Sequence, residues 1–350
     1  MIMGDSHKNN FGFLRLLFAY LVILAHANIW PIQLNLFGLQ GSFSAGKLGG
    51  IAVDGFFLIS GYLIFKSFSQ CSSTSIYLKK RILRIYPGFI AASIFCIFAI
   101  VPLASGWVLV NNLSYSDWII VVSRMILLYQ VTIIGAFPNF PDLPLNSPMW
   151  TIKFEFLCYL IVPILGLFLT KRKQYLTVTI TLCIGLITTI WFGFNLETSG
   201  IFSFIHKFAR LTTAFLIGGL FYFFRDCITW NKKSNLLCFA LIIIAQLSKY
   251  SAEMGILIFG GYLLFNFALN FKNMHLSKIG IKNDISYGVY LYAWPLQVLI
   301  AQLFSSLSTL ENLCFTLICA TILGYLSWIW IEKPFLLMKK WLNNQILTNK

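Results

Sequence analysis

The chain has 350 residues, of which 58% are hydrophobic and 11% are charged, and its mean hydropathy is +0.80. Apolar stretches of about 20 residues recur along it, and each is long enough to cross a bilayer. This composition excludes a soluble globular protein. A net charge of +15 would favour nucleic acid as a partner of a soluble protein. In a membrane protein it instead indicates Lys and Arg gathered on the cytoplasmic side, so we expect the lipid bilayer and no nucleic acid as a partner.

The apolar pattern predicts an all-α, polytopic membrane protein with one domain, residues 1–350. About ten spans are expected, at 11–29, 49–68, 83–104, 149–169, 174–194, 207–225, 234–249, 252–271, 284–304 and 312–335. We expect the first helix to stay uncleaved, because Arg15 interrupts its apolar run and further spans follow it.

The segment 116–134 is apolar enough to cross a membrane, but it carries Arg124 and ends in a Gly- and Pro-rich loop. If it crosses, the later basic loops all move to the outer side, against the positive-inside rule. If it does not cross, the basic residues before the third span lie on the same side as those of the later loops. We therefore predict an interfacial or re-entrant helix here, with both chain termini in the cytoplasm.

Arg15 and His26 lie eleven residues apart in the first predicted helix. Eleven residues make about three helical turns and advance the helix by about 16 Å, so the two side chains share one face at opposite ends. Ionisable residues inside a membrane helix are costly, and each is therefore a functional candidate. An anion-binding cation and a titratable base at this spacing suit a long phosphorylated donor whose reactive end reaches across the membrane.

Two carboxylates are expected near the depth of His26. Counted along the helices from the outer side, His26 lies about 5 Å deep, Asp54 about 8 Å and Glu155 about 9 Å. A carboxylate beside an imidazole fixes its tautomer, so we predict that His26 acts as a general base, with Asp54 as the preferred partner and Glu155 as the alternative. Lys153 is expected to pair with Glu155 or to contact an anionic acceptor. Structural roles remain open: a packing histidine, a helix cap by Asp54 or its ion pair with Lys47, or an internal ion pair of Lys153 with Glu155.

The cytoplasmic end carries different chemistry. Arg81 and Arg84 are three residues apart before the third span and share a helix face. Together with Arg15 they are predicted to hold the phosphates of a nucleotide donor, because arginine suits bidentate contacts to phosphate; the alternative is a topology signal alone. Glu332 closes the last span on the same side, in a helix stop, where it is available to an arginine as counter-ion.

In this order and spacing, the motifs resemble the acyltransferase-3 family of integral membrane enzymes. The resemblance spans nearly the whole chain. It rests on Arg15 with His26, on Val-Asp-Gly-Phe-Phe-Leu-Ile-Ser-Gly-Tyr at 53–62, Arg-Ile-Leu-Arg-Ile-Tyr-Pro at 81–87, Trp-Thr-Ile-Lys-Phe-Glu at 150–155 followed by Tyr159, Ile-Ser-Tyr-Gly-Val-Tyr-Leu at 285–291 with Pro295, and Glu-Lys-Pro-Phe at 332–335.

The resemblance implies transfer of an acyl group, usually acetyl from acetyl-CoA, to a sugar hydroxyl. It places the essential histidine at His26 and the donor-associated arginine at Arg15. We therefore predict an O-acyltransferase of the bacterial cytoplasmic (inner) membrane that moves acetyl from cytoplasmic acetyl-CoA to a cell-surface polysaccharide or oligosaccharide such as O-antigen, without a metal. The predicted catalytic residues are His26, Asp54 and Glu155, and the predicted acetyl-CoA ligands are Arg15, Arg81 and Arg84. His26 acts as a base or as a covalent acyl carrier.

Two departures from the family pattern matter. Many relatives place a histidine just before the Trp-Pro of the penultimate span, where this chain has Ala293. Some relatives also carry a long C-terminal hydrolase-like domain, whereas this chain stops soon after its last span, so we expect it to finish the transfer itself or to use a separate partner. A transporter or flippase for a lipid-linked glycan or small acid, and a structural subunit of a glycosyltransferase, are the alternative functions.

Overall fold

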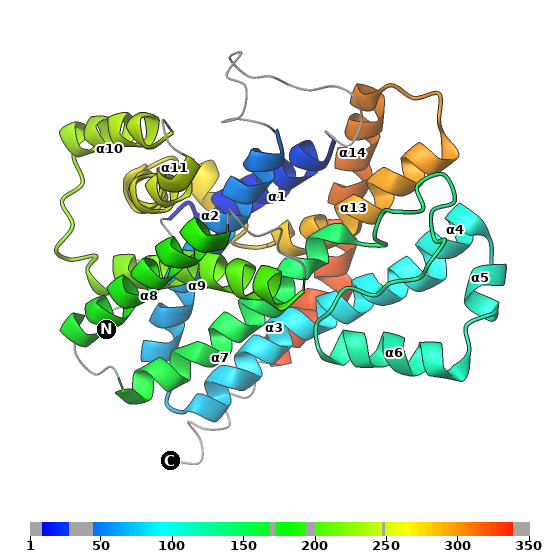
Figure 1. Cartoon of the computed structure of the whole chain (residues 1–350), viewed down its shortest axis with the longest axis horizontal. Helices are drawn as coiled ribbons and strands as arrows, with labels where there is room; N and C mark the ends of the chain where they lie inside the picture. Colours follow the sequence, from blue (N-terminus) through cyan, green and yellow to red (C-terminus); the bar gives the residue numbers. More distant parts are fainter. Residues whose placement is uncertain (1–8, 28–44, 169–171, 194–199, 247–248, 339–350) are drawn as a thin grey trace.

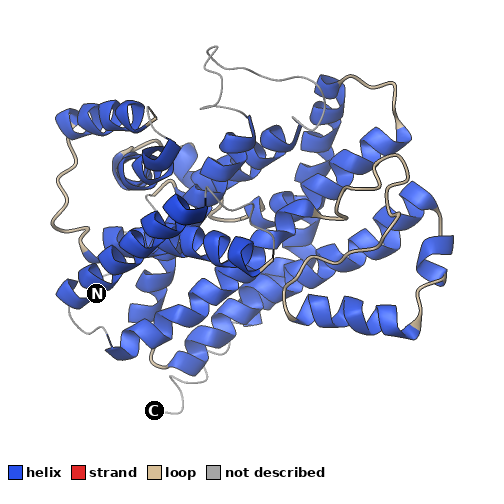
Figure 2. Ribbon diagram, viewed as in Figure 1, coloured by secondary structure: helices blue, strands red, loops and turns tan. Residues whose placement is uncertain are grey.

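A computed structural model describes residues 9–27, 45–168, 172–193, 200–246 and 249–338 (Figure 1). These residues form helices joined by turns and loops, and no strand occurs among them (Figure 2). The predicted all-α class is confirmed. Both chain termini lie outside the described residues, so their cytoplasmic placement stays a prediction.

Every predicted span corresponds to a helix or to a run of consecutive helical segments. The α-helices are α1 (Phe11–His26), α2 (Ala45–Ser69), α3 (Thr74–Phe95), α4 (Val101–Ser105), α5 (Val108–Asn111), α6 (Tyr115–Ile126), α7 (Ile152–Phe168), α8 (Arg172–Gly193), α9 (Ile201–Phe223), α10 (Lys232–Ala245), α11 (Lys249–Gly255), α12 (Gly261–Asn270), α13 (Ser286–Leu303) and α14 (Thr309–Ser327). Three π-helical segments continue them: Cys96–Ile100 joins α3 to α4, Ile256–Gly260 joins α11 to α12, and Trp328–Glu332 extends α14. Short 3-10 helices cover Ser147–Thr151, which leads into α7, and Leu276–Lys278.

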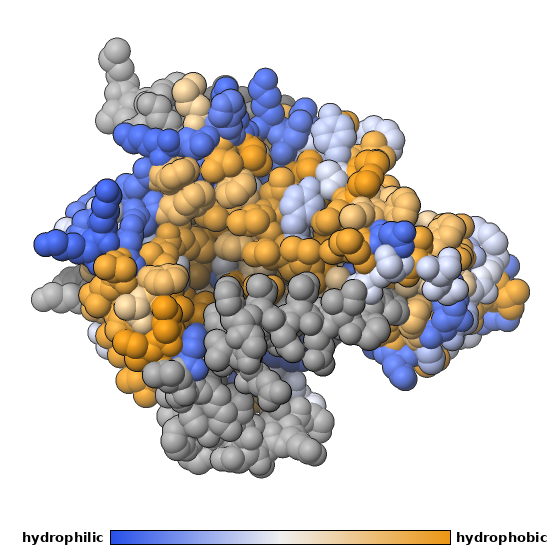
Figure 3. Space-filling model, turned by 90° about the horizontal axis from the view of Figure 1, so that it is seen from above, coloured by the Kyte–Doolittle hydropathy of each residue, from blue (hydrophilic) through white to orange (hydrophobic). Residues whose placement is uncertain are grey.

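Six of the described helices are long and apolar enough to cross a membrane. They are Leu48–Ser69, Thr74–Ser105, Ser147–Gly166, Ile201–Phe223, Ser251–Asn270 and Thr309–Met338. Helix α1 is apolar but shorter, with a length of about 24 Å. Broad hydrophobic surface crosses the middle of the face in Figure 3, and hydrophilic residues gather toward its edges. The chain is thus a helical membrane protein with six candidate spans in its described part, and the predicted number of about ten stays a prediction.

Helix α6 covers the segment whose topology the sequence left ambiguous. Its twelve residues extend about 18 Å, which is short of the roughly 30 Å hydrocarbon core. A capping box starts the helix, because Ser114 and Asp117 exchange side chain–backbone hydrogen bonds. Val121 is buried, whereas Ile119 and Ile126 are exposed, and the helix lies at the periphery beside the α3–α4 region (Figure 1). These features favour the predicted interfacial or re-entrant helix over a span.

Helix α2 lies at the centre of the bundle and packs against α1, α7 and α9. The contact with α9 depends on two glycines. A Cβ on Gly61 would overlap the carbonyl oxygen of Phe215, and a Cβ on Gly218 would overlap that of Leu58. Small residues allow this close approach of helix backbones in membranes. The backbone of α2 is therefore held directly against that of α9.

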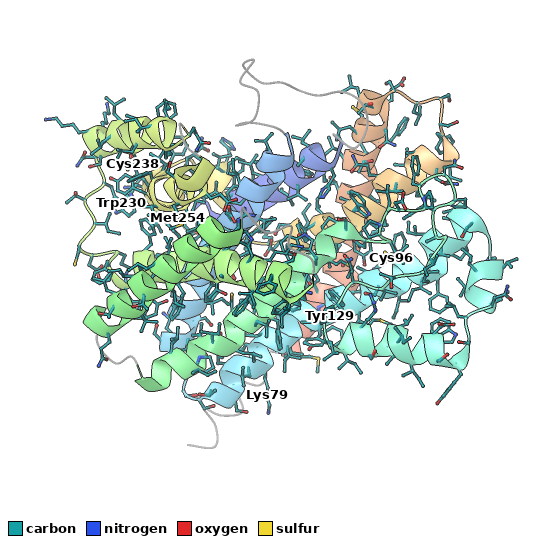
Figure 4. All side chains as sticks on the ribbon, viewed as in Figure 1. Lys79, Cys96, Tyr129, Trp230, Cys238 and Met254 are labelled. Atoms are coloured by element: carbon teal, nitrogen blue, oxygen red, sulfur yellow. The ribbon has the colours of Figure 1, made fainter. Side chains whose placement is uncertain are left out.

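A second hydrophobic cluster anchors the loop between α6 and α7 to α13. It contains Ile97 and Ile100 from the π-helical segment after α3, together with Phe137, Leu145 and Trp294. Figure 4 shows Lys79 near one end of α3 and Cys96 farther along the same long helix. The indole Nε1 of Trp294 donates to the Pro144 carbonyl at 2.9 Å. These contacts hold the 3-10 turn before α7 against α13.

We expect Gly61→Ala to destabilise the protein by about 1–3 kcal/mol, the usual cost of overpacking, because the added methyl group meets a backbone carbonyl that cannot rotate away. The measurement is the thermal unfolding midpoint of detergent-purified protein. Gly185→Ala in α8 is the control, since a Cβ there meets nothing within 4 Å. Equal midpoints for the two variants would contradict the direct backbone contact between α2 and α9.

Candidate functional site

A cavity of ≈ 340 Å³ lies between α1, α2, α3, α7 and the segment that leads into α13. Arg15, Arg81, Arg84 and Glu155 line it. The structure thus brings together the three arginines predicted to bind phosphate and one of the predicted carboxylates. His26 and Asp54 are not part of this lining, and their surroundings are described below.

Two of the arginines share one buried carboxylate at one end of the cavity. The Oδ2 atom of Asp284 lies 3.0 Å from a terminal nitrogen of Arg15 and 2.9 Å from one of Arg84. Ser286 donates to the other carboxylate oxygen at 2.7 Å, and Asp284 is 7% exposed. This residue was missed by sequence reasoning, although its position just before the Ile-Ser-Tyr motif was a usable signal. Asp284 ties α1, α3 and the start of α13 together.

Glu332 is the second counter-ion of Arg84. Its Oε2 lies 3.4 Å from Arg84, its Oε1 accepts a hydrogen bond from Ser327 at 3.3 Å, and the residue is 1% exposed. The predicted counter-ion role of Glu332 is confirmed. The residue ends the π-helical segment Trp328–Glu332, and such segments inside α-helices are frequent at functional sites.

Arg81 differs from its two neighbours because it has no carboxylate partner among the described residues. It is 8% exposed, and it donates to Ser67 Oγ at 3.1 Å. Its guanidinium lies over the rings of Tyr77 and Tyr159, at 5.4 and 5.7 Å from their centroids, and its Nε is buried without a hydrogen-bond partner. A buried charge without a counter-ion is costly, so this end of the cavity favours an anion.

The middle of the cavity is polar on one side. Thr151, Glu155 and Tyr159 follow each other at intervals of four residues and all line the cavity. Tyr159 and Ser60 both donate to Oε1 of Glu155. At the far end of this row, Thr151 Oγ1 lies 2.8 Å from the hydroxyl of Tyr290. Sequence reasoning identified Glu155 but gave no role to Ser60 or Tyr290.

His26 ends α1 and lies beyond this row. Its Nδ1 is 2.7 Å from the carbonyl oxygen of Val22, and its ring meets the edge of Trp294 with centroids 4.8 Å apart. Trp294 follows Tyr290 by one turn of α13, so His26 lies near the end of the cavity away from Asp284. A carbonyl oxygen only accepts, so Nδ1 carries the proton, and in the neutral ring Nε2 keeps the free lone pair.

Asp54 contacts a cation instead of His26. It is 3% exposed, and its Oδ2 lies 2.7 Å from a terminal nitrogen of Arg210, which also donates to the Gly50 carbonyl. The expected pairing of Asp54 with His26 is replaced by this ion pair between α2 and α9. Arg210 was missed as a partner, although an arginine in an apolar helix was a signal for a buried carboxylate nearby. The side chain of Lys47, the other expected partner, lies outside the described residues.

Lys153 points away from Glu155. Its ammonium lies 3.9 Å from the centroid of the Tyr129 ring and 5.4 Å from that of Phe204, and Figure 4 labels Tyr129 in the loop after α6. It forms no ion pair with Glu155, so the expected Lys153–Glu155 pair is absent from this part of the molecule. Lys153 and Glu155 are two positions apart on α7 and therefore do not face each other.

No group of three His, Cys, Asp or Glu side chains in the described part of the chain is arranged to hold a metal ion. The arginines and carboxylates of the cavity instead form ion pairs and hydrogen bonds with one another.

Comparison with known proteins identifies the family of the chain. The chain is 27% identical over 344 residues to the O-acetyl transferase of Shigella phage Sf6, an alignment that covers 94% of this chain and 97% of that protein. It is 29% identical over 175 residues to nodulation protein 10 of Rhizobium leguminosarum bv. viciae, covering 46% of this chain and 45% of the relative. No solved structure matches. The acyltransferase domain that defines the acyltransferase-3 family matches residues 9–332, so the chain belongs to this family of acyltransferases.

Proposed function

We propose that the protein is an O-acyltransferase that moves an acetyl group from cytoplasmic acetyl-CoA to a hydroxyl of a cell-surface polysaccharide or oligosaccharide such as O-antigen. Its place is the bacterial cytoplasmic (inner) membrane, with both termini in the cytoplasm. The observation that carries the proposal is the convergence of three arginines in a cavity that Tyr290 also lines, while His26 packs on Trp294, one helical turn beyond Tyr290. The relative named an O-acetyl transferase supports the same reaction class.

The arginine end is proposed to bind the phosphates of coenzyme A. Arg81 offers a buried, uncompensated charge, and guanidinium groups bind phosphate through paired N–H donors. Arg15 and Arg84 are held in place by Asp284 and turn their remaining N–H groups to the ligand. Because their charges are already balanced by Asp284 and Glu332, Arg81 is expected to contribute most to phosphate affinity.

The spacing of Arg15 and His26 matches a donor that lies along the cavity. About 16 Å of helix separates them, a length that the pantetheine arm spans between the phosphates and the thioester. Nε2 of His26 then accepts the proton of the acceptor hydroxyl, and the oxygen of that hydroxyl attacks the carbonyl carbon of the thioester. The carbon–sulfur bond breaks, and the thiolate of coenzyme A leaves and takes up a proton.

The covalent alternative uses the same nitrogen. Nε2 of His26 attacks the thioester and coenzyme A leaves as its thiolate. The sugar oxygen then takes the acetyl group from the imidazolium, and its hydroxyl proton passes to the thiolate. In both routes the Val22 carbonyl, which bonds to Nδ1, supports the required tautomer. Asp54 does not contact His26, so it supports the reaction only indirectly, through its ion pair with Arg210 of α9. Glu155 lines the cavity and acts on the substrate bound there.

We expect His26→Ala to lower the transfer rate at least ~100-fold, the usual range for loss of a general base. The assay uses detergent-purified protein, radiolabelled acetyl-CoA and candidate bacterial surface glycans, without a membrane gradient, so that transport alone gives no signal. His275→Ala, at an exposed position in the loop before α13, is the control and should keep wild-type activity. Full activity of His26→Ala would remove His26 from the mechanism.

We expect Arg81→Met to raise the KM for acetyl-CoA about 10-fold or more with a smaller effect on kcat, because a charge-assisted hydrogen bond is worth about 1.5–3 kcal/mol. Steady-state kinetics and calorimetric binding of coenzyme A measure this effect. Arg225→Met removes an exposed arginine outside the cavity and should leave both constants unchanged. An unaltered affinity of Arg81→Met for coenzyme A would place the phosphates elsewhere.

A further inference from the structure

A row of polar side chains from α7 and the turn before it lines the cavity. Thr151, Glu155 and Tyr159 extend over two helical turns, a length of about 12 Å. The guanidinium of Arg81 lies over the ring of Tyr159 at one end, and Thr151 contacts Tyr290 at the other. The row therefore lies between the arginine cluster and Tyr290, which precedes Trp294, the ring neighbour of His26, by one helical turn.

Glu155 is the central member of this row and is half-buried. Its Oε1 accepts hydrogen bonds from Ser60 and Tyr159, which fix the orientation of the carboxylate. Its Oε2 forms no hydrogen bond with a described residue, and no described cation lies within ion-pair distance. An ionised carboxylate accepts about four hydrogen bonds, so Glu155 has acceptor capacity that the surrounding helices do not use.

The α2 residues that line the cavity are mostly apolar. They include Phe56, Phe57, Ile59, Leu63 and Ile64, and Ser60, which bonds to Glu155, is the polar exception. A cavity that combines hydrogen-bond acceptors with so much hydrocarbon suits an uncharged chain that alternates amide groups with methyl and methylene groups. A phosphate in this part of the cavity would be repelled by Glu155, and a sugar ring, with hydroxyls around its whole edge, would leave some of them against the hydrocarbon.

We propose that Glu155 is a binding residue for the pantetheine arm of the donor and accepts a hydrogen bond from one of its two amide N–H groups. The methyl groups of the arm then pack on the apolar side chains of α2. This inference rests on the proposed function, and it gives the carboxylate a role toward the donor in place of the expected role toward His26. Ser60 and Tyr159 are positioning residues that hold the Glu155 carboxylate.

The test is a double-mutant cycle in which one change is made in the protein and the other in the donor, and kcat/KM is compared across the four combinations. Two acetyl-CoA analogues are used, each with one amide N–H of the pantetheine arm replaced by an ester oxygen. Wild-type protein should use at least one analogue with a kcat/KM several-fold below that of acetyl-CoA. In Glu155→Ala most of that penalty should disappear, because the hydrogen-bond acceptor is already gone.

Two further variants keep the test decisive if Glu155→Ala folds poorly. Glu155→Gln retains one oxygen acceptor without the charge and should show a smaller loss of discrimination. Ser60→Ala should weaken discrimination in the same direction, because the carboxylate loses one of its positioning hydrogen bonds. Glu311→Gln, at the exposed start of α14, is the matched control and should discriminate between donors as the wild-type protein does.

The proposal is overturned if kcat/KM for acetyl-CoA divided by kcat/KM for the analogue is the same in wild type and in every Glu155 variant. The change in the protein and the change in the donor would then act independently. A Glu155→Ala variant that raises only the KM for the glycan, with an unchanged analogue ratio, would also overturn it and assign Glu155 to the acceptor. Failure of wild-type protein to use acetyl-CoA at all would overturn the proposed function first, whereas normal turnover without coupling would overturn this inference alone.

Discussion

The arrangement of the cavity depends on how a membrane protein tolerates buried charge. Ionised side chains away from water need partners, and Asp284 supplies one carboxylate to two arginines from different helices. Removing it would leave Arg15 without a carboxylate partner among the described residues and Arg84 with Glu332 alone. The positions of α1 and α3 relative to the start of α13 therefore depend on an electrostatic contact and not only on hydrophobic packing.

The two ends of the molecule differ in charge balance. At one end three arginines face two carboxylates, which leaves one positive charge in excess. Toward the other end, Arg210 is paired with both Asp54 and Glu253, and the imidazole of His26 contacts a backbone carbonyl and an indole. An anion gains at the first end only, so a donor with one charged terminus has a defined direction in the cavity. This asymmetry accords with the proposed delivery of the acetyl group toward His26.

Much of the fold was predictable from the sequence, because long apolar runs and their charged flanks fix where helices lie. The convergence of Arg15, Arg81 and Arg84 was also predictable, since their spacing places them at one end of their helices. Contacts across the bundle were not. Counting residues gives the depth of Asp54 but not its rotation about the helix axis, and rotation directs it to Arg210 instead of His26. The π-helical segment that positions Glu332 likewise departs from the 3.6-residue repeat on which sequence patterns rest.

The hydrogen bond between Nδ1 of His26 and the carbonyl oxygen of Val22 lies within a single helix. Its acceptor belongs to the main chain, so no side-chain replacement at position 22 short of distorting the helix deletes it. The imidazole moves with α1 as a unit and does not rely on any distant carboxylate. Under the proposed function, changes in loops on the same face consequently leave the protonation pattern of the imidazole intact.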